Sequence, residues 1–169
     1  MGLCALNEVK SLGILSEALR NVHFYTVEAE REFDPAARGL DLLDRLANDP
    51  GWAWLRSVSS LVGEIDHVLA TDPGVTRAEV GTVAARARGL LFGEGELRDE
   101  AFLERYRPLL QQSHALAAAH GKLKLVLDHL PAEPEDQGDR RAARESWRRR
   151  TERTLAERRD RGRRVGDER

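Results

Sequence analysis

The chain has 169 residues, a formal net charge of −2 and a hydrophobic content of 41%. These values predict one soluble globular domain with some non-globular sequence attached, and no apolar run approaches the roughly 18 residues of a membrane span. The N-terminal sequence lacks the charged and apolar regions of a secretory signal. Cys4 is the single cysteine, which excludes an internal disulfide and a cysteine metal cluster. We therefore expect a cytoplasmic protein with an unpaired thiol.

Helical spacing of apolar residues begins at Leu12. Steps of three and four from Leu12 to Phe33 predict one helix. This helix should end at Asp34, because the residue before a proline is pushed out of the α region. A second, short helix is predicted over residues 36–47, and the turn-forming sequence N-D-P-G over residues 48–51 closes it.

The most regular pattern of the chain runs from Trp52 to Ala70, and two of the three tryptophans open it. Its apolar residues recur at steps of three and four and so share one helix face. We predict that this stretch is the central helix of the fold. The inward residues are Leu55, Val58, Leu61, Val62, Ile65, Val68 and Leu69.

Capping signals divide the following sequence. Thr76 and Glu79 form a capping-box pattern, in which each side chain bonds a backbone N–H of the other residue, and predict the start of a helix. The next apolar pattern, over residues 99–112, contains Pro108, which predicts a kink or a break nearby. Ser113 can cap a further helix, so the sequence leaves open whether this region forms one kinked helix or two.

Strand-like alternation is absent, so the predicted fold class is all-α. We expect an up-and-down helical bundle of four main helices plus a short helix over residues 12–131. Residues 132–169 hold 13 arginines and 10 acidic residues, whereas residues 1–131 hold 14 basic and 19 acidic residues. Because the C-terminal segment has too few apolar residues to bury a core, we expect a flexible Arg-rich tail that is disordered or transiently helical.

A metal site is the first chemical interpretation to consider. Glu64 and His67 have the Glu-x-x-His spacing that places two ligands inside carboxylate-bridged di-metal bundles. A second copy of this motif is missing, since residues 111–114 carry an amide in place of the carboxylate. His114 and His120 lie six residues apart and point about 120° away from each other on a helix. We therefore predict no metal and no cofactor, and keep a metal-dependent enzyme only as an alternative.

Asp66 stands at the edge of the apolar stripe, where a carboxylate must find a partner or lose its charge. An ion pair or a cap within the bundle would make Asp66 structural. A cleft shared with Arg56 and His120 would instead make these three residues a binding site. They are our candidate binding residues, and no residue is predicted to be catalytic.

The tail supplies a second candidate interface. Residues 140–164 contain 12 arginines and four acidic residues. Arginine pairs with phosphate, and an exposed tryptophan stacks on bases, so the nucleic-acid candidates are Trp147, Arg148, Arg149 and Arg150. The acidic residues that interrupt the arginine run are also typical of a solvated appendage. The chain has 24 arginines and three lysines, which indicates a GC-rich genome. In such a genome an Arg-rich tail can arise without selection.

The run W-x-W-L-R-x-x-S-x-L-V-x-x-I-D and the later L-A-x-A-H-G-x-L resemble short uncharacterised all-helical proteins from GC-rich bacteria. Those proteins are expected to have W-L-R-P-L-S-x-L-I-x-x-I-D, and here Ser57 replaces the proline and Val58 the leucine. The resemblance covers about residues 40–130. It implies an all-α fold in a bacterial cytoplasm and no activity. The matching residues are Trp54, Leu55, Arg56, Ser59, Leu61, Ile65, Asp66, His120 and Gly121.

The sequence contains no catalytic motif, phosphate loop or complete metal set. This favours a non-enzymatic protein-interaction module that binds a protein partner or a second copy of itself through helix faces. Nucleic-acid binding through the tail and a metal-dependent enzyme are the alternatives.

Overall fold

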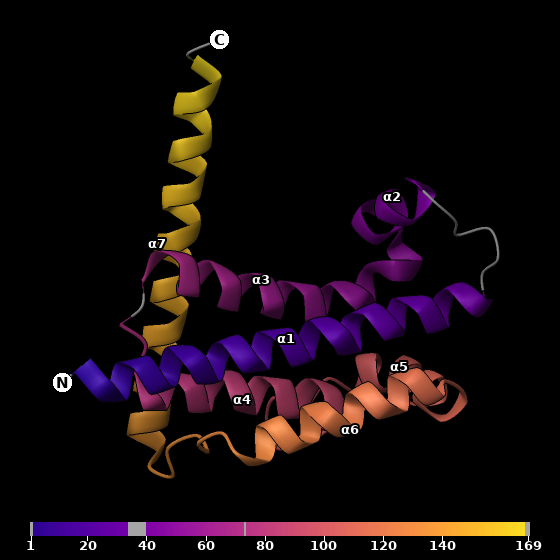
Figure 1. Ribbon diagram of the computed structural model, residues 1–169, viewed down its shortest axis with the longest axis horizontal. Helices are drawn as coiled ribbons and strands as arrows, with labels where there is room; N and C mark the ends of the chain where they lie inside the picture. The colour runs from indigo at the N-terminus through magenta and orange to yellow at the C-terminus, as the bar shows by residue number, and fades with distance from the viewer. Residues whose placement is uncertain (1, 34–39, 73, 168–169) are drawn as a thin grey trace.

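A computed structural model describes residues 2–33, 40–72 and 74–167 of the chain (Figure 1). The described residues form helices and no strand, which confirms the predicted all-α class. The predicted helix end at Asp34 and the predicted start of the second helix lie outside the described residues. The elements in chain order are α1 (Gly2–Phe33), α2 (Leu40–Asn48), the 3-10 helix η1 (Pro50–Leu55), α3 (Arg56–Thr71), α4 (Arg77–Phe92), α5 (Glu100–Gln112), α6 (His114–Asp128) and α7 (Gln137–Asp167).

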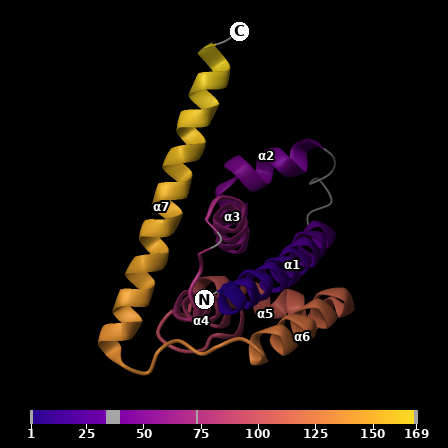
Figure 2. The same ribbon diagram turned by 60° about the vertical axis from the view of Figure 1, so that its left-hand side comes forward.

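The central helix of the fold is α1. It packs mainly against α3 and α6 and also contacts α4, α5 and η1 (Figures 1 and 2). The prediction that residues 52–70 form the central helix is therefore wrong. A helix covered on one side shows the sharpest apolar period, whereas a helix covered on several sides spreads its apolar residues around its axis. The regular period of α3 thus indicates one buried face, not a central position.

The two N-terminal tryptophans of the regular pattern lie in η1 and not in the first turn of an α-helix. Asp49 caps η1 by accepting a hydrogen bond from the Gly51 N–H at 2.7 Å. Trp52 is 4% exposed. Arg105 of α5 lies over the Trp54 ring, 5.1 Å from its centroid, and donates a hydrogen bond to the Gly51 carbonyl at 2.6 Å. These contacts fasten η1, which leads into α3, to α5.

The capping signals are confirmed. Both hydrogen bonds of the box formed by Thr76 and Glu79 are present at the start of α4. The region from residue 99 to residue 130 forms two helices, because Ser113 has an extended backbone and its Oγ accepts from the Leu116 N–H at 3.2 Å. Pro108 lies inside α5, which continues past it to Gln112, so the chain breaks at the cap and not at the proline.

The prediction of a disordered tail is wrong over residues 137–153. The first half of α7 packs against α3 and α4, and beyond it the helix projects away from the other helices (Figures 1 and 2). Ala143, Trp147 and Thr151 recur every four residues on one helix face and are all buried. Average composition suggested an unfolded segment, but one large aromatic residue with two small neighbours gives α7 a narrow buried stripe.

Gly89 allows α4 to approach the loop that leads to α5. A Cβ atom at Gly89 would lie 2.5 Å from the carbonyl oxygen of Leu97 and 2.6 Å from its carbonyl carbon, and backbone atoms cannot swing away. We expect Gly89→Ala to lower the free energy of unfolding by about 1–3 kcal/mol in urea denaturation. Gly121 is the matched control, because a Cβ there meets nothing within 4 Å. Gly121→Ala should raise stability by about 0.5–1 kcal/mol, and equal effects of the two variants would contradict the close approach.

Candidate functional site

Asp66 forms its contacts within the folded body. The Ser16 hydroxyl donates to Asp66 Oδ1 at 2.6 Å, and Arg20 forms an ion pair with the other carboxylate oxygen. Both partners belong to α1, so the carboxylate joins α3 to the central helix. This arrangement matches the structural interpretation of Asp66.

Arg56 and His120 lie in two further environments. The Arg56 guanidinium donates to the Ala47 carbonyl at 2.7 Å, near the end of α2. His120 packs its ring against Phe92 with 4.2 Å between ring centroids, and its Nδ1 lies 2.9 Å from the Tyr106 hydroxyl. Burial lowers the pKa of His120, and the charge of the nearby Lys124 lowers it further. The contacts described for Arg56, Asp66 and His120 thus go to different neighbours and do not assemble a shared cleft.

The carboxylate of Glu64, one of the two weak metal candidates, is held by other side chains. Arg86 donates to both of its oxygens, at 2.5 Å and 3.2 Å, and Trp147 Nε1 donates at 3.3 Å. Among the described residues, no group of three or more His, Cys, Asp or Glu side chains is arranged to hold a metal ion. Glu64 and His67 therefore have the spacing of two di-metal ligands, but the described residues do not supply the additional ligands that such a site needs.

Trp147 cannot stack on a nucleic-acid base, because its side chain lies in the core and is 2% exposed. The other tail candidates divide into two groups. Arg150 is 13% exposed and is engaged in ion pairs. Arg148 and Arg149 are exposed and pair with Glu145 on the same helix at 2.7 Å and 3.1 Å. Base stacking by Trp147 is thus a wrong prediction, and phosphate binding by Arg148 and Arg149 stays a prediction.

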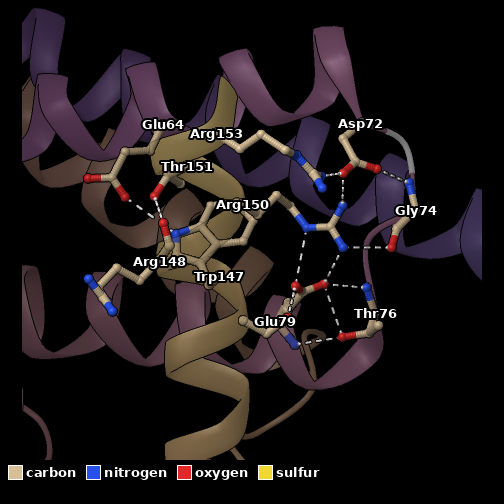
Figure 3. Close-up of polar contacts among 11 residues, drawn as sticks. Glu64, Asp72, Gly74, Thr76, Glu79, Trp147, Arg148, Arg150, Thr151 and Arg153 are labelled. Carbon is tan, nitrogen blue, oxygen red and sulfur yellow. Dashed lines mark hydrogen bonds and ion pairs between the residues drawn. The ribbon is translucent and has the colours of Figure 1, made fainter. Parts of the chain in front are cut away.

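A buried polar cluster fastens α7 to the start of α4 (Figure 3). The Glu79 side chain is 1% exposed. It accepts hydrogen bonds from the Thr76 N–H at 2.8 Å, from the Ser146 hydroxyl at 2.8 Å and from Arg150 Nε at 3.2 Å. Arg150 also pairs with Asp72 at 2.6 Å. The cap of α4 therefore serves as the docking point of α7.

Desolvation by burial acts to raise the pKa of the Glu79 carboxyl. The hydrogen bonds from Thr76, Ser146 and Arg150 and the charge of Arg150 act in the opposite direction, and together they hold this pKa below its ordinary value. Glu79 is therefore ionised at neutral pH and balances the Arg150 charge. All its described contacts lie within the fold, which makes the cluster structural.

A different feature lies open to solvent, namely a groove of about 350 Å³ between α1 and α6. We call it the α1–α6 groove. Its α1 wall carries residues at steps of four, three and four, so that they share one line along the helix. These residues are Ile14, Ala18, Asn21 and Tyr25.

The α6 wall of the α1–α6 groove repeats the same steps of four, three and four. It is built largely from alanine, so another helix can approach its backbone closely. The residues on this line are Ala115, Ala119, Lys122 and Val126, and Ala118 lies beside them.

Large exposed apolar side chains flank the α1–α6 groove. Ile14 is 46% exposed, Phe24 is 57% exposed and Leu125 is 63% exposed. Phe24 follows the groove residue Glu17 by seven positions, and Leu125 follows the groove residue Ala118 by seven. Seven residues make about two turns of an α-helix, so each of these side chains lies on nearly the same side of its helix as that groove residue. The apolar surface thus continues from the floor of the groove onto its rim.

Sequence reasoning missed this groove because it followed only the buried stripe of α1. The residues of the second line, beginning at Ile14, interleave with the buried residues Leu12, Leu15, Leu19 and Val22. A second apolar line at the same spacing was a readable signal that α1 offers two faces. The spacing alone could not show that the described part of the chain leaves one of them uncovered.

Comparisons with protein-family models, with curated proteins and with solved structures found no match to this chain. None of the described helices is both long enough and apolar enough to cross a membrane. The resemblance to short helical bacterial proteins stays a prediction.

Proposed function

We propose that the protein is a non-enzymatic interaction module and that the α1–α6 groove is its binding surface. The observation that carries the proposal is an open groove lined mainly by alanine and larger apolar side chains, with Glu17, Asn21 and Lys122 among them, and with exposed apolar side chains on its rim. Contiguous exposed apolar surface on a folded protein is typical of a protein-binding site.

The dimensions of the α1–α6 groove suit a helical partner. Each wall spans 11 residue steps, which is about 17 Å or three turns of a helix. A helix with apolar residues at steps of three and four can place them between the two walls. Two alanines exposed on α6, Ala115 and Ala118, leave room for such side chains.

The contacts of three carboxylates of the chain also support a non-enzymatic function. Asp66, Glu64 and Glu79 are each engaged by hydroxyl or arginine donors of the fold. Groups engaged in this way hold helices together and are not poised for acid–base chemistry. A cytoplasmic location and a bacterial origin stay predictions.

A photo-crosslinking experiment tests the proposal. A benzophenone amino acid at Leu125, on the rim of the α1–α6 groove, is expected to form covalent adducts with a protein partner in a lysate of the source organism, because its ring lies next to the bound chain. The matched control places the same amino acid at Arg149, which is 72% exposed on α7. Adducts are resolved by gel mass and identified by mass spectrometry. Equal labelling at both positions, or none at either, would overturn the proposed function.

A further inference from the structure

We infer that the C-terminal half of α7 binds double-stranded DNA, with its arginines on the phosphates that border the major groove. This surface is separate from the α1–α6 groove and does not depend on the proposed function of that groove. The structure divides α7 into a docked half, residues 137–153, which packs on α3 and α4, and a projecting half, residues 154–167, which extends away from the other helices (Figures 1 and 2).

Acidic residues of the body engage arginines of the docked half. Asp72, directly after α3, forms ion pairs with Arg150 and Arg153. Glu133, in the loop before α7, accepts a hydrogen bond from Arg144 Nε at 2.7 Å. The body therefore balances much of the positive charge that the docked half carries.

The projecting half contains the densest positive charge of the chain. Residues 158–164 hold five arginines and one aspartate, a net charge of +4, over about two turns of helix. No other helix of the described chain runs beside this stretch (Figures 1 and 2). The acidic residues of the body, which balance the docked half, are therefore not beside the projecting half.

Projection also separates these arginines from an acidic body. Residues 1–131 carry 14 basic and 19 acidic residues, so the body repels DNA. From residue 154 to Asp167 the helix rises about 20 Å, whereas charges at physiological ionic strength are screened over about 8 Å. A phosphate bound near the tip of α7 is thus attracted by the arginines and is largely screened from the body.

The residues of α7 favour a duplex over a single strand or a membrane surface. Single-strand sites stack bases on aromatic side chains, but Trp147 is the single aromatic residue of α7 and is buried in the core. Insertion into a membrane surface needs a continuous apolar helix face, and the apolar residues of the projecting half are Leu155, Ala156 and Val165. The phosphates of a duplex, in contrast, are bound by guanidinium groups without stacking or insertion.

The dimensions of a single helix favour DNA over RNA. An α-helix with its side chains is about 10–12 Å across, and the major groove of B-form DNA is about 12 Å wide. The major groove of duplex RNA is too narrow for side chains to read. Because no described helix lies beside the projecting half, it can enter the DNA groove and reach the phosphates of both strands.

Fluorescence anisotropy of the full chain with a labelled DNA duplex of mixed sequence tests the inference. We expect binding that weakens steeply with salt, with a slope of about −3 to −5 in a plot of log K against log salt concentration, because each arginine that contacts a phosphate releases a counterion. Absence of binding at about 50 mM salt would overturn the inference.

A double variant tests whether the projecting half makes the contacts. Arg163→Gln combined with Arg164→Gln should weaken duplex binding about ten- to hundredfold and make the salt slope shallower by about 2. The matched control is Arg107→Gln combined with Lys124→Gln, which makes the same change of net charge at exposed residues of α5 and α6. Circular dichroism checks that both variants remain folded. Equal weakening by the two double variants would show a general effect of net charge and would refute the assignment to α7.

Competition with other polyanions tests the choice of a DNA duplex. The competitors are single-stranded DNA, duplex RNA and vesicles of phosphatidylserine, and each should displace the labelled duplex less well than unlabelled duplex DNA does. A competitor that displaced it equally well would contradict the binding of α7 in a DNA major groove. These measurements do not involve the α1–α6 groove, so their failure is distinguishable from failure of the proposed function.

Discussion

Replacing Trp147 with alanine is expected to lower the free energy of unfolding by about 3–5 kcal/mol. The Trp147 ring is 2% exposed and belongs to the main hydrophobic core, where it joins α7 to α3 and α4. Truncation removes this burial and leaves a cavity that the surrounding helices fill only in part. It also removes the Nε1 hydrogen bond to Glu64, which measures 3.3 Å. Urea denaturation followed by circular dichroism measures the change.

Two control variants separate the contributions of Trp147. Trp147→Phe keeps an aromatic ring and loses the indole N–H, so it should cost about 1–2 kcal/mol. Arg149→Ala changes an exposed residue of the same helix and should stay within about 0.5 kcal/mol. If Trp147→Ala were as mild as Arg149→Ala, α7 would be an appendage of the kind that its composition suggests.

Replacing Glu79 with alanine should lower the free energy of unfolding by about 3–5 kcal/mol. The substitution takes one of the two carboxylate partners of Arg150, which is 13% exposed and keeps only its ion pair with Asp72, and removing one partner of a buried ion pair is costly. The Thr76 N–H and the Ser146 hydroxyl lose an acceptor as well. Glu79→Gln keeps the shape and most hydrogen bonds and should cost less, about 1.5–3 kcal/mol. Equal stability of Glu79→Ala and the wild-type protein in urea would contradict the role of this cluster.

The same carboxylate makes stability depend on pH. The pKa of Glu79 in the folded protein lies below the ordinary value of 4.5. Its contribution is therefore fully present above pH 4.5 and is lost as the pH falls through the folded pKa. Measured below pH 4.5, the stability of Glu79→Gln should fall less steeply than that of the wild-type protein. Parallel slopes for the two proteins would show that other carboxyl groups dominate the acid response.

Local signals in the sequence were sufficient for much of the helical structure. Thr76 and Ser113 mark helix starts through hydrogen bonds that span only three residues, so no knowledge of the tertiary fold is needed to read them. The inward residues of the regular pattern were also readable, since Leu55 at the end of η1 and Ile65 and Val68 in α3 are fully buried. The sequence did not show which helix is central, because the spacing along one helix does not say which other helices cover it.

The place of α7 shows why composition misled. The segment looked unable to fold because it holds few apolar residues, yet its packed half buries the Trp147 ring with two small neighbours and pairs Arg150 with carboxylates of the body. The partners of Arg150 are Asp72 and Glu79, which precede it by more than 70 positions in the printed sequence. Nothing at short range links these residues, so only the packed structure shows that a charged helix belongs to the body.

The sequence by itself determined the all-α class, the helix caps and the inward face of α3, because hydrogen bonds and side-chain periodicity within one helix are local. Only the tertiary structure decided that α1 is central, that Trp147 is buried and that Asp66 is paired. It also decided that one line of residues on α1 lies beside a matching line on α6 and that this face remains open. These are contacts between segments that are distant in the sequence. They depend on which helix faces are buried when all the helices pack together, and the spacing within one helix does not determine that.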